Sequence, residues 1–198
     1  EGLYLANLTA CDAGGKCRTL TFNFTAMAKT ALQAIVDVTS VDIEGITQFE
    51  SKNFTLNITV TNLNYTVTAY SVNVSSGPPA GTNWIVYGCN LEDIAPNQSK
   101  YCLLNVTVLE KTSPGTYSMR PFVRWNNADG SDSSNQTEVV YVIVLPTRII
   151  NITLKPEFLL VHHGASNSTW FIVNSTGNAE VRNVSLGCKG ATSLCPYV

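Results

Sequence analysis

The residues with the clearest chemistry are asparagines in the pattern Asn-x-Ser/Thr, the acceptor sequence for N-linked glycans. Thirteen of the nineteen asparagines in this 198-residue chain stand in that pattern. Serine and threonine together contribute 38 residues, and random placement would give only roughly four such motifs. The excess predicts an exported chain that carries many glycans at a cell surface. The motif asparagines are Asn7, Asn23, Asn53, Asn57, Asn64, Asn73, Asn97, Asn105, Asn135, Asn151, Asn167, Asn174 and Asn183.

The six cysteines form three close couples that lie far apart along the chain. Six cysteines allow fifteen pairings, and an oxidising compartment fits the glycan motifs. Zinc is the alternative, but no couple has the Cys-x-x-Cys spacing of zinc sites. Each short bridge would contribute about 3 kcal/mol or less, so we expect the disulfides to lock hairpin ends. The simplest framework consists of the local pairs Cys11–Cys17, Cys89–Cys102 and Cys188–Cys195.

No other group of residues predicts catalysis or cofactor binding. His162 and His163 precede Gly164 and are typical of a solvated loop rather than of a ligand set. The run Asp129-Gly130-Ser131-Asp132 lacks the remaining ligands and the closing glutamate of a calcium loop, and a hairpin turn explains it better. Neither a glycine-rich phosphate loop after a strand nor a Gly-x-Ser-x-Gly nucleophile motif occurs. We therefore expect a protein that is not an enzyme and has no cofactor and no metal.

The composition excludes several classes of partner. Charged residues make up 13% of the chain, against about 25% in an ordinary soluble domain, and glycan hydration can supply the missing solubility. The net charge is −2, without a basic patch, so nucleic acid is not an expected partner. No apolar run reaches the length of a membrane helix, so we expect no membrane insertion. The chain starts without a basic and apolar leader, and we expect a mature product whose signal peptide has been removed.

The glycan motifs also predict which way the strands face. A glycosylated asparagine must point into solvent, so its two neighbours on a β-strand point the other way. Asn57, between Leu56 and Ile58, is an example of this alternation. Seven motif asparagines lie between apolar residues, which predicts amphipathic strands: Asn7, Asn23, Asn57, Asn64, Asn73, Asn105 and Asn151. Asn97, Asn135 and Asn167 lack such neighbours and are expected in loops.

Expected strands recur every ten to fifteen residues and are separated by Gly, Pro and Asn-rich turns. One stretch, 27–38, has a helical composition and stays ambiguous. The pattern predicts an all-β protein of the Ig-like or pilin-like β-sandwich type. The expected strands span 20–28, 54–61, 65–74, 84–88, 101–109, 117–125, 138–145, 149–154, 169–173 and 181–186.

The chain also repeats itself. Residues 35–39 (IVDVT) are echoed by residues 149–153 (IINIT), and residues 22–30 match residues 104–112. The second copy has only three residues after its last cysteine, so we expect it to lack the strands that would complete a sandwich. The order therefore resembles the end of a module, a whole module and the start of another. We expect two tandem sandwich units and three segments: a tail at 1–32 with a donor-strand candidate, a sandwich at 33–146 and an incomplete unit at 147–198.

An incomplete sandwich leaves an apolar groove and unpaired strand edges, which must be covered. The N-terminal segment can fold back within its own chain, or it can enter the groove of the next molecule by strand addition. With Asn7 facing outward, the residues that would face the groove are Tyr4, Ala6, Leu8 and Ala10. Alternatively, residues 1–10 form an ordinary edge strand of their own domain.

A secreted, Thr- and Asn-rich all-β chain with this density of glycan motifs, local disulfides and an open sandwich resembles the archaeal thread filament subunits of Sulfolobus-type organisms. The resemblance implies an extracellular filament or pilus, polymerised head-to-tail by donor strand complementation, that serves adhesion or biofilm formation. It also implies that the partners are further copies of the chain and that residues near 1–10 are the donor. The alternative is an Ig-like ectodomain of an adhesin, an S-layer component or a receptor.

Overall fold

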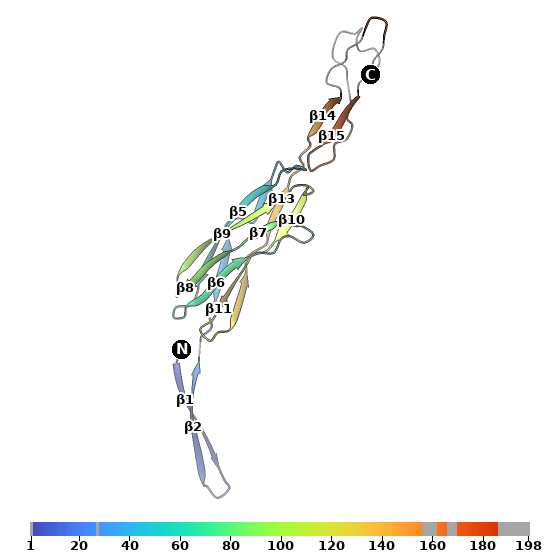
Figure 1. Ribbon diagram of the computed structural model, residues 1–198. Helices are drawn as coiled ribbons and strands as arrows, with labels where there is room; N and C mark the ends of the chain where they lie inside the picture. Colours follow the sequence, from blue (N-terminus) through green and yellow to red (C-terminus); the bar gives the residue numbers. More distant parts are fainter. Residues whose placement is uncertain (1, 27, 156–161, 166–169, 186–198) are drawn as a thin grey trace.

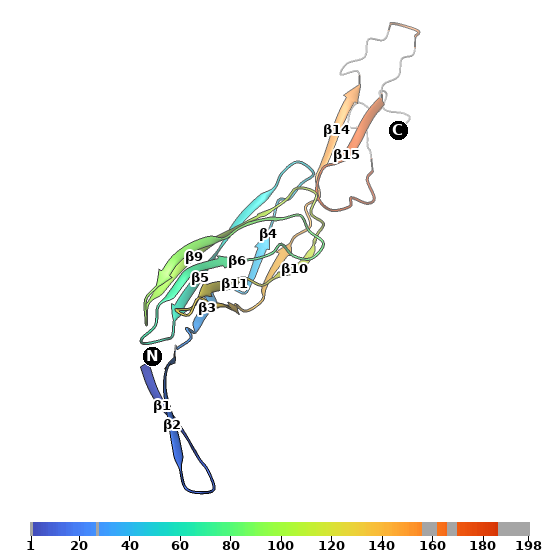
Figure 2. The same cartoon turned by 60° about the horizontal axis from the view of Figure 1, so that its bottom comes forward.

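The computed structural model describes residues 2–26, 28–155, 162–165 and 170–185. These residues form fifteen strands and no helix, which confirms the prediction of an all-β sandwich protein. Figure 1 shows three parts in a row along one elongated molecule: an N-terminal hairpin, a central sandwich and a second hairpin (Figure 1). The view in Figure 2 has the same order of parts (Figure 2). Among the described residues there is no helix with the length and apolarity needed to cross a bilayer.

The terminal hairpins are β1 (Gly2–Cys11) with β2 (Cys17–Ala26), and β14 (Ile150–Lys155) with β15 (Trp170–Ser175). The strands of the central sandwich are β3 (Leu32–Val36), β4 (Ser40–Ile43), β5 (Lys52–Asn62), β6 (Ala69–Ser75), β7 (Ile85–Tyr87), β8 (Cys89–Ile94), β9 (Ser99–Val108), β10 (Gly115–Met119), β11 (Phe122–Asn126), β12 (Asp132–Gln136) and β13 (Val140–Val144).

One layer of the sandwich is a four-stranded antiparallel sheet in the order β3-β5-β9-β7. Its strands alternate between buried and exposed residues, as a sheet with one solvated face requires. On β9, Leu104 and Val106 are buried while Asn105 between them is exposed. The same alternation in the sequence predicted that the motif asparagines lie on the outer face.

The facing layer contains two sheets, β12-β11-β6-β8 and β10-β13-β4. The pair β13 and β4 is parallel, whereas the other pairs in the described part of the chain are antiparallel. Buried side chains from both layers, including Leu56, Val72, Val123 and Val142, form a single core. The middle part of the chain therefore buries its own apolar surface without help from either terminal hairpin.

Three of the expected strands and the ambiguous stretch differ from the structure. The ambiguous stretch 27–38 contains strand β3, because its alternating Leu32, Ala34 and Val36 pack into the core. The stretch 117–125 is two strands, β10 and β11, separated at Arg120 and Pro121. The stretch 65–74 is a strand only from residue 69 onward, and residues 181–185 form no strand.

Two motif asparagines were assigned to the wrong kind of element. Asn64 lies in a turn, where its Oδ1 accepts hydrogen bonds from the Thr66 and Val67 amides at 2.8 and 3.0 Å. Its neighbours Leu63 and Tyr65 are therefore exposed rather than buried. Asn135 was expected in a loop but lies in strand β12, because polar residues suffice for a strand at the solvated edge of a sheet.

The structure contains two of the expected disulfides. Cys11 and Cys17 form the last pair of the β1–β2 ladder, so this bridge locks a hairpin end as predicted. The Cys89–Cys102 bridge instead joins β8 of one layer to β9 of the other, because Cys102 faces the core. The prediction that it locks a hairpin end was wrong. The third pair, Cys188–Cys195, lies outside the described residues.

A buried asparagine, Asn127, connects the N-terminal hairpin to the sandwich. Its Oδ1 accepts hydrogen bonds from the Thr30 amide at 3.0 Å and from the Thr30 hydroxyl at 2.6 Å. Its Nδ2 donates to the Ser131 carbonyl at 3.0 Å and to the Ser133 hydroxyl at 2.8 Å. Thr30 lies between β2 and β3, so this side chain fastens the linker between hairpin and sandwich.

We predict that Asn127→Ala lowers the free energy of unfolding of the sandwich by about 2–4 kcal/mol, because it leaves several buried polar groups without partners. Urea unfolding followed by tryptophan fluorescence measures the change. Asn126→Ala is the matched control, since Asn126 is the exposed neighbour and is not a glycan motif residue; its effect should stay within about 0.5 kcal/mol. Equal effects of the two variants would contradict the role of Asn127 in fastening the linker to the sandwich.

Candidate functional site: the two terminal hairpins

The N-terminal hairpin has one apolar face and one mostly polar face. In its register Tyr4 lies opposite Phe24, Ala6 opposite Phe22, and Leu8 opposite Leu20. Residues directly opposite each other in a ladder lie on the same face of the sheet. The Tyr4 and Phe24 rings accordingly stack with their centroids 5.4 Å apart. We call this surface, made of Tyr4, Ala6, Leu8, Ala10, Leu20, Phe22 and Phe24, the N-face.

The opposite side of the same hairpin carries both of its glycan motifs. Asn7 lies opposite Thr21 and Asn23 lies opposite Leu5. The Thr21 hydroxyl donates a hydrogen bond to Asn7 Oδ1 at 2.7 Å, and the Thr9 and Thr19 hydroxyls lie 2.8 Å apart. The apolar exceptions on this side are Leu3 and Leu5, near the start of the strand.

The N-face is open to solvent. The large apolar side chains of this hairpin range from 47% exposed for Phe22 and Phe24 to 73% exposed for Leu3. β1 and β2 form a sheet of their own with no third strand, so the outer edge of each strand is unpaired within the described residues. An isolated two-stranded hairpin is marginally stable in water. The Cys11–Cys17 disulfide and the Asp12 turn, whose carboxylate accepts from the Gly14 and Lys16 amides at 2.9 Å, hold its tip together.

The C-terminal hairpin has the same two-sided character. Ile152 lies opposite Val173 and Leu154 lies opposite Phe171, and these residues share one apolar face. Asn151 lies directly opposite Asn174 on the other face, so both glycan motifs of this hairpin point the same way. Apart from the partly buried Val173, its large apolar side chains are between 40% and 60% exposed. Two of them, Trp170 and Ile172, lie on the side of the motif asparagines. We call the surface made of Ile150, Ile152, Leu154, Phe171 and Val173 the C-face.

The loop 45–51 attaches the base of this hairpin to the sandwich. Thr47 forms a bridge with Gly177, and Gln48 donates through its amide to the Thr176 carbonyl and through Nε2 to the Ser175 carbonyl, both at 2.9 Å. Asn178 adds bonds from Nδ2 to the carbonyls of Thr112 and Leu145, each at 3.2 Å.

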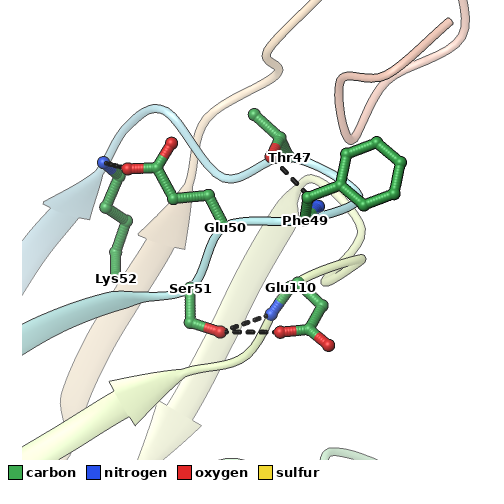
Figure 3. A network of polar contacts seen from close by, with 6 residues as sticks. All are labelled: Thr47, Phe49, Glu50, Ser51, Lys52 and Glu110. Carbon is green, nitrogen blue, oxygen red and sulfur yellow. Dashed lines mark hydrogen bonds and ion pairs between the residues drawn. The ribbon is translucent and has the colours of Figure 1, made fainter.

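This loop is itself braced by a network of polar contacts (Figure 3). The Phe49 amide donates to Thr47 Oγ1 at 3.1 Å, and Lys52 pairs with Glu50 at 2.5 Å. Ser51 Oγ bonds to the amide and to the carboxylate of Glu110, both at 3.0 Å. Side chains from β5 and from the end of β9 therefore fix the loop that carries the hairpin.

The structure describes twelve of the thirteen motif asparagines, and Asn167 lies outside the described residues. Ten of the twelve are exposed, and Asn57 and Asn64 are partly buried. By contrast, the fully buried asparagines, Asn62 and Asn127, stand outside the motif. The apolar neighbours of Asn57, Asn73 and Asn105 are buried as expected. Glycosylation of these asparagines stays a prediction. Their exposure is compatible with it.

The expected donor residues Tyr4, Ala6, Leu8 and Ala10 do share one face. The structure adds what the sequence reasoning missed, namely that β1 is paired with β2 along its whole length. The strand β1 does not fold back onto the second repeat or onto the sandwich sheets.

The remaining candidate residues form no reactive site. His162 and His163 are exposed, with His163 in a turn. Asp129 and Gly130 form the turn between β11 and β12, and hydrogen bonds from the Ser131 hydroxyl and amide lower the pKa of the Asp129 carboxyl. No group of three or more potential metal ligands occurs among the described residues.

Comparison with known proteins gives no family. No protein-family model and no curated protein matches the sequence. Among solved structures, a variant of BcpA, the major pilin subunit of Bacillus cereus, is similar at 10% identity and a TM-score of 0.39, covering 86% of this chain. The chain spans only 63% of that pilin. The seventh PapD-like domain of human CEP192 is similar at 11% identity and a TM-score of 0.34, over 62% of this chain and 90% of that domain. These similarities are too weak to assign a family.

We predict that replacing both Cys11 and Cys17 with serine destabilises the β1–β2 hairpin locally by about 2 kcal/mol, the value for a loop of this length. The hairpin lacks contacts that could compensate, so its amides should exchange faster with solvent. Hydrogen exchange with mass spectrometry measures this in β1 and β2. Amides of β5 and β9 should be unchanged and serve as the internal control, and unchanged exchange in β1 and β2 would contradict the prediction.

Proposed function

We propose that this protein is a structural subunit of a glycosylated extracellular filament whose subunits join head-to-tail by β-strand addition. The observation that carries this proposal is the pair of amphipathic hairpins at opposite ends of the molecule. Each hairpin exposes an apolar face and unpaired strand edges within the described residues, and such surfaces associate unless they are covered.

The two faces do not cover each other within one chain. The central sandwich lies between the hairpins (Figure 1), and the polar network around Thr47 and Glu110 anchors the C-terminal hairpin at the far end. Contact between the two hairpins, and pairing of their open edges, therefore requires two molecules. A contact between two different surfaces of identical subunits is heterologous, and its repetition gives a filament unless the rotation closes into a ring.

The positions of the glycan motifs support an extracellular role. On both hairpins the motif asparagines lie on the face opposite the apolar one. Glycans at Asn7, Asn23, Asn151 and Asn174 would therefore leave the N-face and the C-face free for association. A surface filament of this kind fits adhesion or biofilm formation, without any catalytic role.

We predict that Phe22→Asp reduces the association constant between subunits by about 100-fold or more. Burial of a phenylalanine contributes about 1.5–3 kcal/mol, a buried unpaired carboxylate adds a further cost, and each 1.4 kcal/mol is tenfold in affinity. Thr21→Asp is the matched control, because Thr21 is the preceding residue on the opposite face and belongs to no glycan motif. Sedimentation and negative-stain electron microscopy of the purified chains measure assembly.

The native chain and Thr21→Asp should form filaments, which should appear as an SDS ladder that collapses only on heating. Phe22→Asp should remain monomeric, with its sandwich folded. Equal assembly of both variants would contradict the proposal. A native chain that stays monomeric would instead favour the Ig-like ectodomain of an adhesin, S-layer component or receptor. Filaments that form equally well after removal of residues 1–10 would contradict the role of the N-terminal hairpin in the junction.

A further inference from the structure

We infer that β2 of one copy pairs antiparallel with β15 of the next, giving a four-stranded sheet in the order β14-β15-β2-β1. This inference rests on the proposed head-to-tail assembly and specifies its edge, its register and its outward face. The central sandwich contains strands equivalent to both hairpins, already paired with each other.

The N-terminal hairpin corresponds to the β7–β9 strand pair of the sandwich, which β8 separates along the chain. Leu3 lies opposite Thr25 in the hairpin, and Ile85 lies opposite Thr107 in the strand pair. The differences 85 − 3 and 107 − 25 are both 82, so one shift without gaps aligns the two pairings. The same shift aligns the repeat found in the sequence, in which residues 22–30 match residues 104–112.

The C-terminal hairpin corresponds to the β3–β5 strand pair of the sandwich, which β4 separates along the chain. The sequence repeat aligns Ile149 with Ile35, and residues 171–176 (FIVNST) align with residues 54–59 (FTLNIT). The structure agrees with both alignments. Ile35 lies opposite Thr59, and the corresponding Thr176 amide donates to the Ile149 carbonyl at 2.9 Å.

In the sandwich these two strand pairs are joined edge to edge. The order β3-β5-β9-β7 places β5 beside β9, with β3 and β7 on the outside. The corresponding strands at the ends of the molecule are β15 and β2. Within the described part of the chain each is paired on one side only, β15 with β14 and β2 with β1, so the edges that would meet are unpaired there.

Transfer of the β5–β9 register gives the pairing between copies. Phe54 lies opposite Val106 and Leu56 lies opposite Leu104 in the sandwich. The equivalent pairs are Phe171 with Phe24, and Val173 with Phe22. Ser175 lies opposite Leu20 in the same register, because Ile58 lies opposite Cys102.

This register makes the two apolar faces continuous. Phe22 and Phe24 belong to the N-face, and Phe171 and Val173 belong to the C-face. Asn174 would lie opposite Thr21, which is itself opposite Asn7, so the four glycan motifs of the two hairpins share the other side. A slip of one residue would turn the motif asparagines of one hairpin onto the apolar side, and hydrated glycans exclude that arrangement.

The chain directions also agree. β2 runs from the hairpin tip toward its own sandwich, and β15 likewise runs toward its own sandwich. The hairpins lie at opposite ends of the molecule (Figures 1 and 2). Two molecules placed end to end in the same orientation therefore present β2 and β15 antiparallel, as β5 and β9 are.

Cysteine pairs between copies test the register. Leu20→Cys with Ser175→Cys should give disulfide-linked ladders after mild oxidation of assembled filaments, seen on a boiled non-reducing gel. Neither change removes a glycan motif. Leu20→Cys with Val173→Cys is the control two residues out of register, where diagonal neighbours lie about 7–8 Å apart, too far for a disulfide. Mixing the two single variants of the first pair should also give linked dimers, which excludes bridges within one chain.

The outcomes separate this inference from the proposed function. Filaments with a ladder only from the Leu20 and Ser175 pair support the register. Filaments that link equally through the control pair, or through neither pair, overturn the register while head-to-tail assembly stands. Native protein that forms no filaments overturns both.

Native filaments allow a second test without substitutions. Amides on the outer edges of β2 and β15 should become protected from hydrogen exchange on assembly, because they gain bonds across the new strand pair. Assembly with protection confined to β1 and β14 would place the contact on the wrong edges and overturn the inference.

Discussion

A β-sheet must cover its apolar face and pair or protect the backbone groups at its edges. The three parts of this molecule meet the requirement in different ways. The central sandwich meets it internally, since the β3-β5-β9-β7 sheet packs against the facing layer and buries residues such as Leu104 and Val106. Each terminal hairpin has the same sequence pattern but lacks a facing sheet in the described part of the chain. Identical local chemistry therefore gives a closed core in the middle and open surfaces at the ends.

The facing layer determines how far the strand equivalent to β1 stays in its own sheet. In the sandwich, β7 ends before Gly88, where the chain leaves its partner strand β9 and continues as β8 in the other layer, paired with β6. At Gly88 the backbone passes so close to the Val74 carbonyl that an added Cβ would lie 2.3 Å from it. The equivalent strand β1 has no second layer to cross to, so it stays paired with β2 as far as Cys11. The length of β1 is thus a consequence of the missing layer.

The sequence alone allowed the all-β class, the local disulfides and the facing of strands such as β5 and β9 to be predicted. These features depend on nearest-neighbour alternation, which a sequence displays directly. Strand β4 and its parallel pairing with β13 could not be predicted, because they depend on contacts about a hundred residues apart. Asn64 was misassigned because the buried amide of Asn62, bonded to the Val67 and Ile94 carbonyls, ends β5 one residue before the expected alternation. The pairing of β1 with β2 could not be predicted either, because the sequence repeat of residues 22–30 and 104–112 covers part of β2 and none of β1.

The direction of the hairpin strands has a mechanical consequence. β1, β2, β14 and β15 run along the length of the molecule (Figure 1). In the proposed assembly, a pull on the filament would load the bonds between β2 and β15 in shear, because backbone hydrogen bonds lie perpendicular to antiparallel strands. All bonds of the junction would then share the load at once, whereas strands set across the axis would open one bond at a time. Within each subunit the tension would pass from β2 to the sandwich through the short linker that Asn127 holds at Thr30, which makes this side chain part of a load-bearing path.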